Sequence, residues 1–116
     1  MAWSAEIKSY KLHISGARSN VSGWTRFVNF FDSDGTQRGF IQFRYNVTTL
    51  PDAYEYNVGT TGKKAVSFYM HEHSYGDVVD LLRNEKPIYL LYYSPHSVYL
   101  STSENEPVGE GPEPSS

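Results

Sequence analysis

The spacing of hydrophobic residues is the feature that most constrains this fold, because it follows a period of two along most of the chain and changes to 3.6 only once. The residues at the change are spaced i, i+3, i+4 and i+7 and form one apolar helical stripe, made of Tyr75, Val78, Val79 and Leu82. Ser74 is placed to cap this helix, and Pro87 stops it within a few residues. The sequence therefore predicts one helix over about residues 75–84.

Segments with period two are the expected strands, and the helix falls between the fifth and the sixth of them. They span residues 5–14, 24–31, 39–47, 53–58, 65–71, 88–93 and 98–102. The Asp34-Gly35 pair predicts a tight hairpin between the second and third strands. Ile7 has the opposite parity to Tyr10 within the first strand, which predicts a bulge near residues 8–9.

Alternation within two strands predicts which side chains face the core. In residues 53–58, Tyr54 should point inward and Glu55 outward. The strand after the helix has no polar residue on either face. It is therefore either central and covered on both faces, or placed under the helix with Tyr89 and Tyr93 outward.

Short turns between most strands predict a mainly antiparallel sheet. The expected fold is mostly β, of the α+β kind, with about seven antiparallel strands in a curled sheet or small barrel and one helix. An open sheet with the helix on one face is the alternative. We expect a single β-rich domain over residues 1–103, followed by a flexible acidic tail, residues 104–116, rich in Pro, Gly, Glu and Ser.

The charge balance argues against nucleic acid as a partner. The formal net charge is −3, and Lys63-Lys64 is the only adjacent basic pair, whereas electrostatic binding of nucleic acid needs concentrated Lys and Arg. The chain has no cysteine, and its first residues lack the pattern of a secretory signal. Its longest apolar run, residues 88–93, is too short to cross a bilayer. We therefore expect a cytoplasmic protein that has no membrane partner.

The densest cluster of reactive side chains is His71-Glu72-His73. Residues two apart on a strand point to one side, so His71 and His73 could supply two metal ligands, with His13 or His96 as a third. No motif fixes that third ligand, and polar residues at a strand end give the same pattern.

Two further segments resemble ligand-binding loops but lack the required context. Residues 32–36 begin like a calcium loop, but Phe43 stands where the late bidentate Glu belongs. Residues 59–64 contain two glycines and lysine, but their spacing is not that of a phosphate-binding loop, and a strand follows. No cofactor is expected, and binding is favoured over enzymatic activity.

Aromatic residues are unusually frequent, at 16% of the chain. A core of this size buries about ten of them, so several should lie on the surface and mark an interface. The candidates for binding are Trp24, Tyr69, Tyr89, Tyr93 and Tyr99.

The sequence predicts a non-catalytic module that binds a protein partner or a second copy of itself through an aromatic sheet surface. A small accessory, inhibitor or immunity-type protein would have this composition. The alternative is a small enzyme or a ligand- or metal-binding barrel with a site centred on His71 and His73. A third hypothesis, a binder of single-stranded nucleic acid, requires a basic groove beside the aromatic residues.

Overall fold

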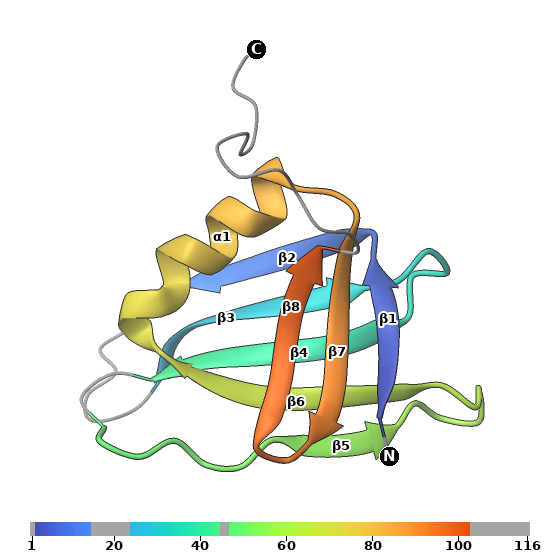
Figure 1. Ribbon diagram of the computed structural model, residues 1–116, viewed down its shortest axis with the longest axis horizontal. Coiled ribbons are helices and arrows are strands. Elements are labelled where there is room, and N and C mark those ends of the chain that lie inside the picture. The colour runs from blue at the N-terminus through green and yellow to red at the C-terminus, as the bar shows by residue number, and fades with distance from the viewer. Residues whose placement is uncertain (1, 15–23, 45–46, 103–116) are drawn as a thin grey trace.

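The computed structural model describes residues 2–14, 24–44 and 47–102, and for residues 24 and 25 it describes the backbone alone. These residues form strands, one short 3-10 helix and one α-helix (Figure 1). The elements are β1 (Trp3–Ile7), β2 (Ser9–Ile14), β3 (Trp24–Phe31), β4 (Gln37–Arg44), β5 (Tyr54–Asn57), β6 (Lys64–His71), η1 (Glu72–Ser74), α1 (Tyr75–Asn84), β7 (Ile88–Ser94) and β8 (Ser97–Thr102).

The strands belong to two sheets, one with the order β2-β3-β4-β6-β5 and one with the order β1-β7-β8. The strands of the smaller sheet run across those of the larger one, and α1 lies on the same side (Figure 1). Neighbouring strands pair antiparallel except β4 and β6, which are parallel. The prediction of about seven antiparallel strands in one curled sheet or barrel was therefore wrong. The described residues form eight strands in two open sheets, although the mostly β character is confirmed.

The first predicted strand, residues 5–14, divides at Lys8 into β1 and β2, which belong to different sheets. In place of the expected bulge, the chain forms a corner at Lys8, where it passes from one sheet to the other. Ala5 and Ile7 are buried on β1, whereas Tyr10 packs against the core from β2. The change of parity in the sequence arises because the chain changes sheets at this point. The backbone N–H of Lys8 donates to the carbonyl of Phe31, which fixes the corner to β3.

The core fills the space between the two sheets and α1. Its fully buried large side chains come from β3, β4, β6 and β7, namely Val28, Phe30, Ile41, Phe43, Val66 and Leu90. The predicted residue range of the helix, 75–84, is confirmed, and its apolar stripe buries Val78, Val79 and Leu82. The helix lies between the sixth and seventh strands and not between the fifth and sixth, because the first predicted strand is two strands. Full burial of such a side chain contributes about 1.5–3 kcal/mol to stability.

The start of α1 differs from the expected cap. Ser74 makes no side-chain capping hydrogen bond, because the 3-10 turn η1 leads directly into α1 and already gives Ser74 helical angles, with φ of −86° and ψ of −5°. An N-cap residue normally has extended angles that aim its hydroxyl at the first free N–H groups.

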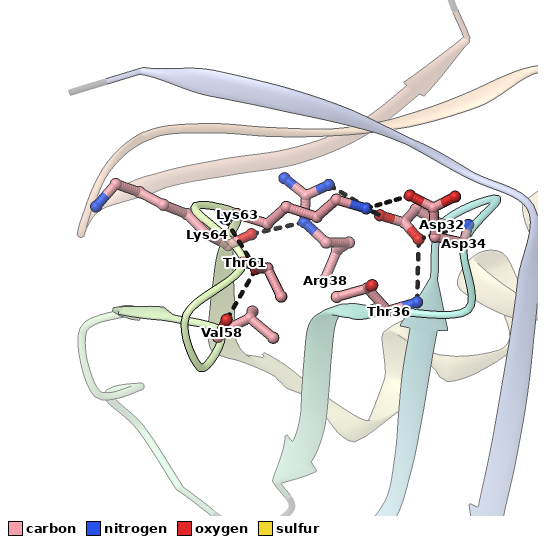
Figure 2. A network of polar contacts seen from close by, with 8 residues as sticks. All are labelled: Asp32, Asp34, Thr36, Arg38, Val58, Thr61, Lys63 and Lys64. Atoms are coloured by element: carbon pink, nitrogen blue, oxygen red, sulfur yellow. Dashed lines mark hydrogen bonds and ion pairs between the residues drawn. The ribbon is translucent and has the colours of Figure 1, made fainter.

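The hairpin between β3 and β4 forms as predicted and carries the most connected polar network in the described chain (Figure 2). Asp32 Oδ1 accepts the backbone N–H groups of Asp34 and Thr36 at 2.9 and 3.0 Å. Its Oδ2 accepts from Arg38 at 3.1 Å and from Lys63 at 2.9 Å. The acidic residues that resemble a calcium loop therefore already have partners. Asp32 binds the backbone of its own turn, and Asp32 and Asp34 both bind Lys63 in the loop between β5 and β6.

This network sets the ionisation of Asp32. Burial alone would raise its pKa, but the hydrogen bonds from Lys63, from two backbone N–H groups and from Arg38 outweigh burial and lower the pKa to about 2. Each donor favours the charged form of the carboxylate. The side chain is therefore a charged anchor with little access to solvent.

On the edge strand β5 the predicted facing was wrong. Tyr54 is 66% exposed and stacks against Tyr56, whereas Glu55 occupies the position opposite Val66 on the inner face. The reason is a partner from the other sheet, because the indole of Trp3 donates a hydrogen bond to the Glu55 carboxylate. Alternation alone cannot detect such a partner.

In the described part of the chain, no helix has the length and apolar character needed to cross a membrane. The predicted tail, residues 104–116, and the last part of the predicted strand 39–47, at residues 45–46, lie outside the described residues.

Candidate functional site

The aromatic residues predicted to bind a partner do not share one surface. Tyr89, Tyr93 and Tyr99 lie together on the outer face of the three-stranded sheet. Tyr69 lies on the outer face of the five-stranded sheet, on the other side of the core. Trp24 begins β3, but its side chain lies outside the described part of the structure.

The first surface, here called the tyrosine face, consists of Tyr89, Leu91, Tyr93 and Tyr99. Tyr93 and Tyr99 are 51% and 52% exposed, and their ring centroids are 5.7 Å apart in an edge-to-face arrangement. Leu91 and Tyr99 are direct cross-strand partners. The strand β7 is central in its sheet, yet only the face that carries Ile88, Leu90 and Tyr92 is buried, so Tyr89 and Tyr93 point outward.

An apolar groove continues from the tyrosine face around the edge of β8. A cavity of about 300 Å³ lies between β8, β6 and α1, and Tyr99 forms part of its wall together with Met70, Leu81 and Leu100. β8 is an edge strand of the three-stranded sheet. The edge of β8 that faces away from β7 therefore has no strand partner in the described sheet order.

The second surface, here called the aromatic platform, consists of His13, Phe27, Phe40 and Tyr69 together with the cations Lys11 and Arg44. These side chains occupy alternate positions on the outer face of the five-stranded sheet. The rings of His13 and Phe27 stack at 4.4 Å with an interplanar angle of 18°, and Phe27 contacts Phe40 at 5.1 Å. The guanidinium of Arg44 lies over the ring of Tyr69 at 5.1 Å.

The polar groups of the aromatic platform are cations and amides. The Nη2 of Arg44 donates to Oε1 of Gln42 at 3.4 Å, while the buried Nε of Arg44 has no acceptor within the described residues. Lys11 is exposed and forms no ion pair with any described residue. Among the described strand positions in register with the outward side chains of this sheet, none holds a carboxylate.

The two histidines predicted to bind a metal do lie next to each other. The rings of His71 and His73 stack with centroids 5.7 Å apart and an interplanar angle of 7°. His13 is instead stacked on Phe27, and His96 pairs with Asp52 at 3.3 Å in another loop. Among the described residues, no group of three or more His, Cys, Asp or Glu side chains is arranged to hold a metal ion.

The immediate surroundings of the histidine pair also disfavour a metal cation. Arg44 is the cross-strand neighbour of His71, and it places a fixed positive charge beside that position. The histidine-centred site therefore stays a prediction without a described third ligand.

A further cavity, of about 680 Å³, lies between the corner of β1 and β2 and the last turn of α1. The charged side chains around it include Glu6, Lys8, Arg83 and Lys86, and all of them are partly or fully exposed. The mixture of signs selects no charged ligand, and the described residues that line this cavity include no buried polar side chain that would select a specific one.

Comparisons of this chain with protein-family models, with curated proteins and with solved structures found no match.

Proposed function

We propose that this chain is a non-catalytic binding module that associates with a second copy of itself through the tyrosine face. The observation that supports it best is the contact between Tyr93 and Tyr99, which leaves about half of each side chain exposed. Tyrosine is enriched in protein interfaces because its ring buries a large apolar area while its hydroxyl still finds a polar partner.

The edge position of β8 in the described sheet order supports a second copy as the partner. Two β8 strands that pair antiparallel about a two-fold axis near Tyr99 would give the middle of each strand the second strand partner that this order lacks. Tyr99 lies in the middle of β8, so it would approach the same residue of the partner copy. The adjacent apolar groove, with Met70 and Leu100 in its wall, extends the surface that such a pairing would cover.

Sedimentation velocity over a range of protein concentrations tests this proposal. We expect the wild-type chain to shift from monomer to dimer as concentration rises, and a variant with Tyr93→Ser and Tyr99→Ser to stay monomeric. Tyr54→Ser is the matched control, since Tyr54 is even more exposed, at 66%, but belongs to the other sheet. It should dimerise like the wild type.

Two outcomes would contradict the proposal. A wild-type chain that remains monomeric at the highest concentration would exclude self-association and leave a different protein as the partner. A double variant that dimerises as strongly as the wild type would show that the tyrosine face is not the interface.

A further inference from the structure

The last described strand ends close to the cavity of about 680 Å³ at the corner of β1 and β2. Thr102, the last residue of β8, pairs with Ile88, and Ile88 pairs on its other side with Ile7. Ile7 and Ile88 both line the cavity. Neighbouring strands are about 4.8 Å apart, so Thr102 lies about 10 Å from Ile7. About three extended residues span that distance. Residues 103–116, which lie outside the described part of the chain, are therefore long enough to reach this cavity.

The wall of the cavity is apolar, and its rim carries two cations. Ile7, Leu82 and Ile88 are buried core residues that form part of the wall. Arg83 and Lys86 are both exposed at the rim, and neither forms an ion pair with a described residue. A ligand for this cavity would therefore combine an apolar group with carboxylates.

The other charges around the cavity weaken the attraction for a free anion. Glu6 and Lys8 pair with each other at 3.3 Å, so they offset one another. Glu85 is a further acidic residue of the lining, and the carboxyl end of α1 adds a partial negative charge. The two cations exceed these negative charges only slightly. A free charged ligand is therefore not selected, whereas a ligand that is held nearby by the chain itself needs only weak contacts.

The sequence that follows β8 has the composition that this cavity requires. Residues 103–116 contain four Glu and neither Lys nor Arg, and their one large apolar residue is Val108. Glu106 and Glu110 flank Val108 at a distance of two residues on either side. Pro107 fixes its own φ and favours extended backbone for Glu106, which reduces the conformational entropy that this segment loses when it docks.

We propose that residues 104–110 of this chain dock into the cavity, with Val108 against the apolar wall and Glu106 and Glu110 beside Lys86 and Arg83. A short tether gives such a segment an effective concentration in the millimolar range, so weak ion pairs and one small apolar contact are sufficient. The docked segment closes the cavity to other ligands. This inference goes beyond the proposed function, because it concerns a contact within one chain and does not require a second copy.

Paramagnetic relaxation enhancement in the full chain tests the proposal. The chain has no cysteine, so Gly111→Cys gives a single site for a nitroxide label just beyond the docking segment. At about 20 mM salt, we expect the label to reduce the amide signals of residues 8–9 and 83–86 to about half or less, as the millimolar effective concentration implies. The amides of β5 provide the internal reference, because β5 contacts Trp3 at the opposite end of β1 from Ile7. Their signals should keep their intensity.

Two sets of variants separate the two kinds of contact. Arg83→Gln combined with Lys86→Gln should lower the ratio of docked to free segment about threefold or more, since each exposed ion pair contributes little. Both side chains are exposed, so the fold should be retained. Lys11→Gln is the matched control, because Lys11 is an exposed lysine on the outer face of the other sheet and should leave the ratio unchanged. Val108→Ser should lower the ratio through loss of the apolar contact.

Dilution of the labelled chain into excess unlabelled wild-type chain distinguishes a contact within one chain from a contact between copies. Signal loss that persists supports the proposal, and signal loss that disappears would show that the segment docks on another copy and would overturn it. Equal signal loss at the cavity and at β5, or an unchanged loss in the double Gln variant, would also overturn it. Sedimentation reports the dimer and the diluted sample reports the single chain, so failure of either proposal is distinguishable from failure of the other.

Discussion

The indole Nε1 of Trp3 donates a 2.7 Å hydrogen bond to Oε2 of Glu55, and this bond joins an edge strand of one sheet to an edge strand of the other. The ring of Trp3 stacks on Tyr92 at 5.8 Å, and the guanidinium of Arg38 lies over it at 5.3 Å. Trp3 is thus a link between the two layers through polar and aromatic contacts together.

Replacing Trp3 by Phe should destabilise the protein by about 1–2 kcal/mol, because the half-buried carboxylate of Glu55 would lose its donor while most ring contacts remain. Urea unfolding measures the change in free energy. Combining it with Glu55→Gln in a double-mutant cycle should give a coupling energy of about 1 kcal/mol. A coupling near zero would show that the two sheets do not depend on this bond.

Replacing Asp32 by Asn should lower the free energy of unfolding by about 1–2 kcal/mol at pH 7, because the folded state holds the pKa of Asp32 at about 2, below the ordinary value of 3.8. The contribution of a carboxylate with a lowered pKa is present above the ordinary value and is lost as pH falls through the folded pKa. The wild type should therefore lose this stability between about pH 5 and pH 2, and the variant should lose less over that window.

Asp34→Asn is the control for this experiment. Asp34 contacts Lys63 at 2.6 Å, but its side chain is 70% exposed, so the loss should stay below about 1 kcal/mol. Thermal or urea unfolding at several pH values between 2 and 7 compares the two variants with the wild type. Identical acid sensitivity in the wild type and Asp32→Asn would contradict the assigned role of Asp32.

Replacing Gly39 by Ala should destabilise the protein by about 1–3 kcal/mol through overpacking. An added Cβ would lie 2.7 Å from Leu90 Cδ2 and 2.8 Å from Phe30 Cδ2, and both of these side chains are fully buried. Gly76→Ala in α1 is the matched control, because nothing lies within 4 Å of its added Cβ. That control should stabilise the protein by about 0.5–1 kcal/mol, and denaturant midpoints report both changes.

Tyr92 should limit stability at alkaline pH. Burial raises the pKa of Tyr92 above its ordinary value of 10.0, and the nearby negative charge of Glu55 raises it further. A raised pKa means that its contribution is complete below pH 10.0 and is lost as pH rises through the folded pKa. Unfolding measured between pH 9 and 11.5 should show a smaller alkaline loss in Tyr92→Phe than in the wild type. An equal loss would contradict this role.

Local patterns in the sequence were sufficient for the elements whose signals are local. The spacing of Val78, Val79 and Leu82 defined the buried stripe of α1, and Asp34-Gly35 defined the hairpin between β3 and β4. In the hairpin, Gly35 adopts a φ of +80°, which a residue without a side chain reaches at little cost.

Relationships between distant segments could not be predicted in this way. The opposite parity of Ile7 and Tyr10 showed that the strand is interrupted near Lys8. Alternation of hydrophobic and polar residues predicts which face of a sheet a side chain occupies, but it does not predict which strand lies next to it. The parallel pairing of β4 with β6 could not be predicted either. The chain between these two strands forms β5, which lies on the far side of β6 and not next to β4. The exposed position of Tyr54 follows from the preference of Glu55 for Trp3, fifty-two residues away in the sequence.

The sequence indicated that aromatic residues would be exposed, but it did not indicate where on the two sheets they would lie. An excess of aromatic residues correctly indicated exposed rings, and Tyr93 and Tyr99 are among them. Phe27 and Phe40 were not among the predicted surface residues, although their positions in the sequence indicate that they face outward. Both have the same parity as polar residues on their own strands, so a hydrophobic ring recurs on the side that faces water.

The pairing of Trp3 with Tyr92 sets the order in which this chain can assemble. The hairpin of β3 and β4 needs only a short loop to close, so it can form early during synthesis. By contrast, β1 must wait for β7, which leaves the ribosome more than eighty residues later. During that interval Ile7 lacks the strand with which it pairs in the folded structure, so the smaller sheet can be completed only after β7 has been synthesised.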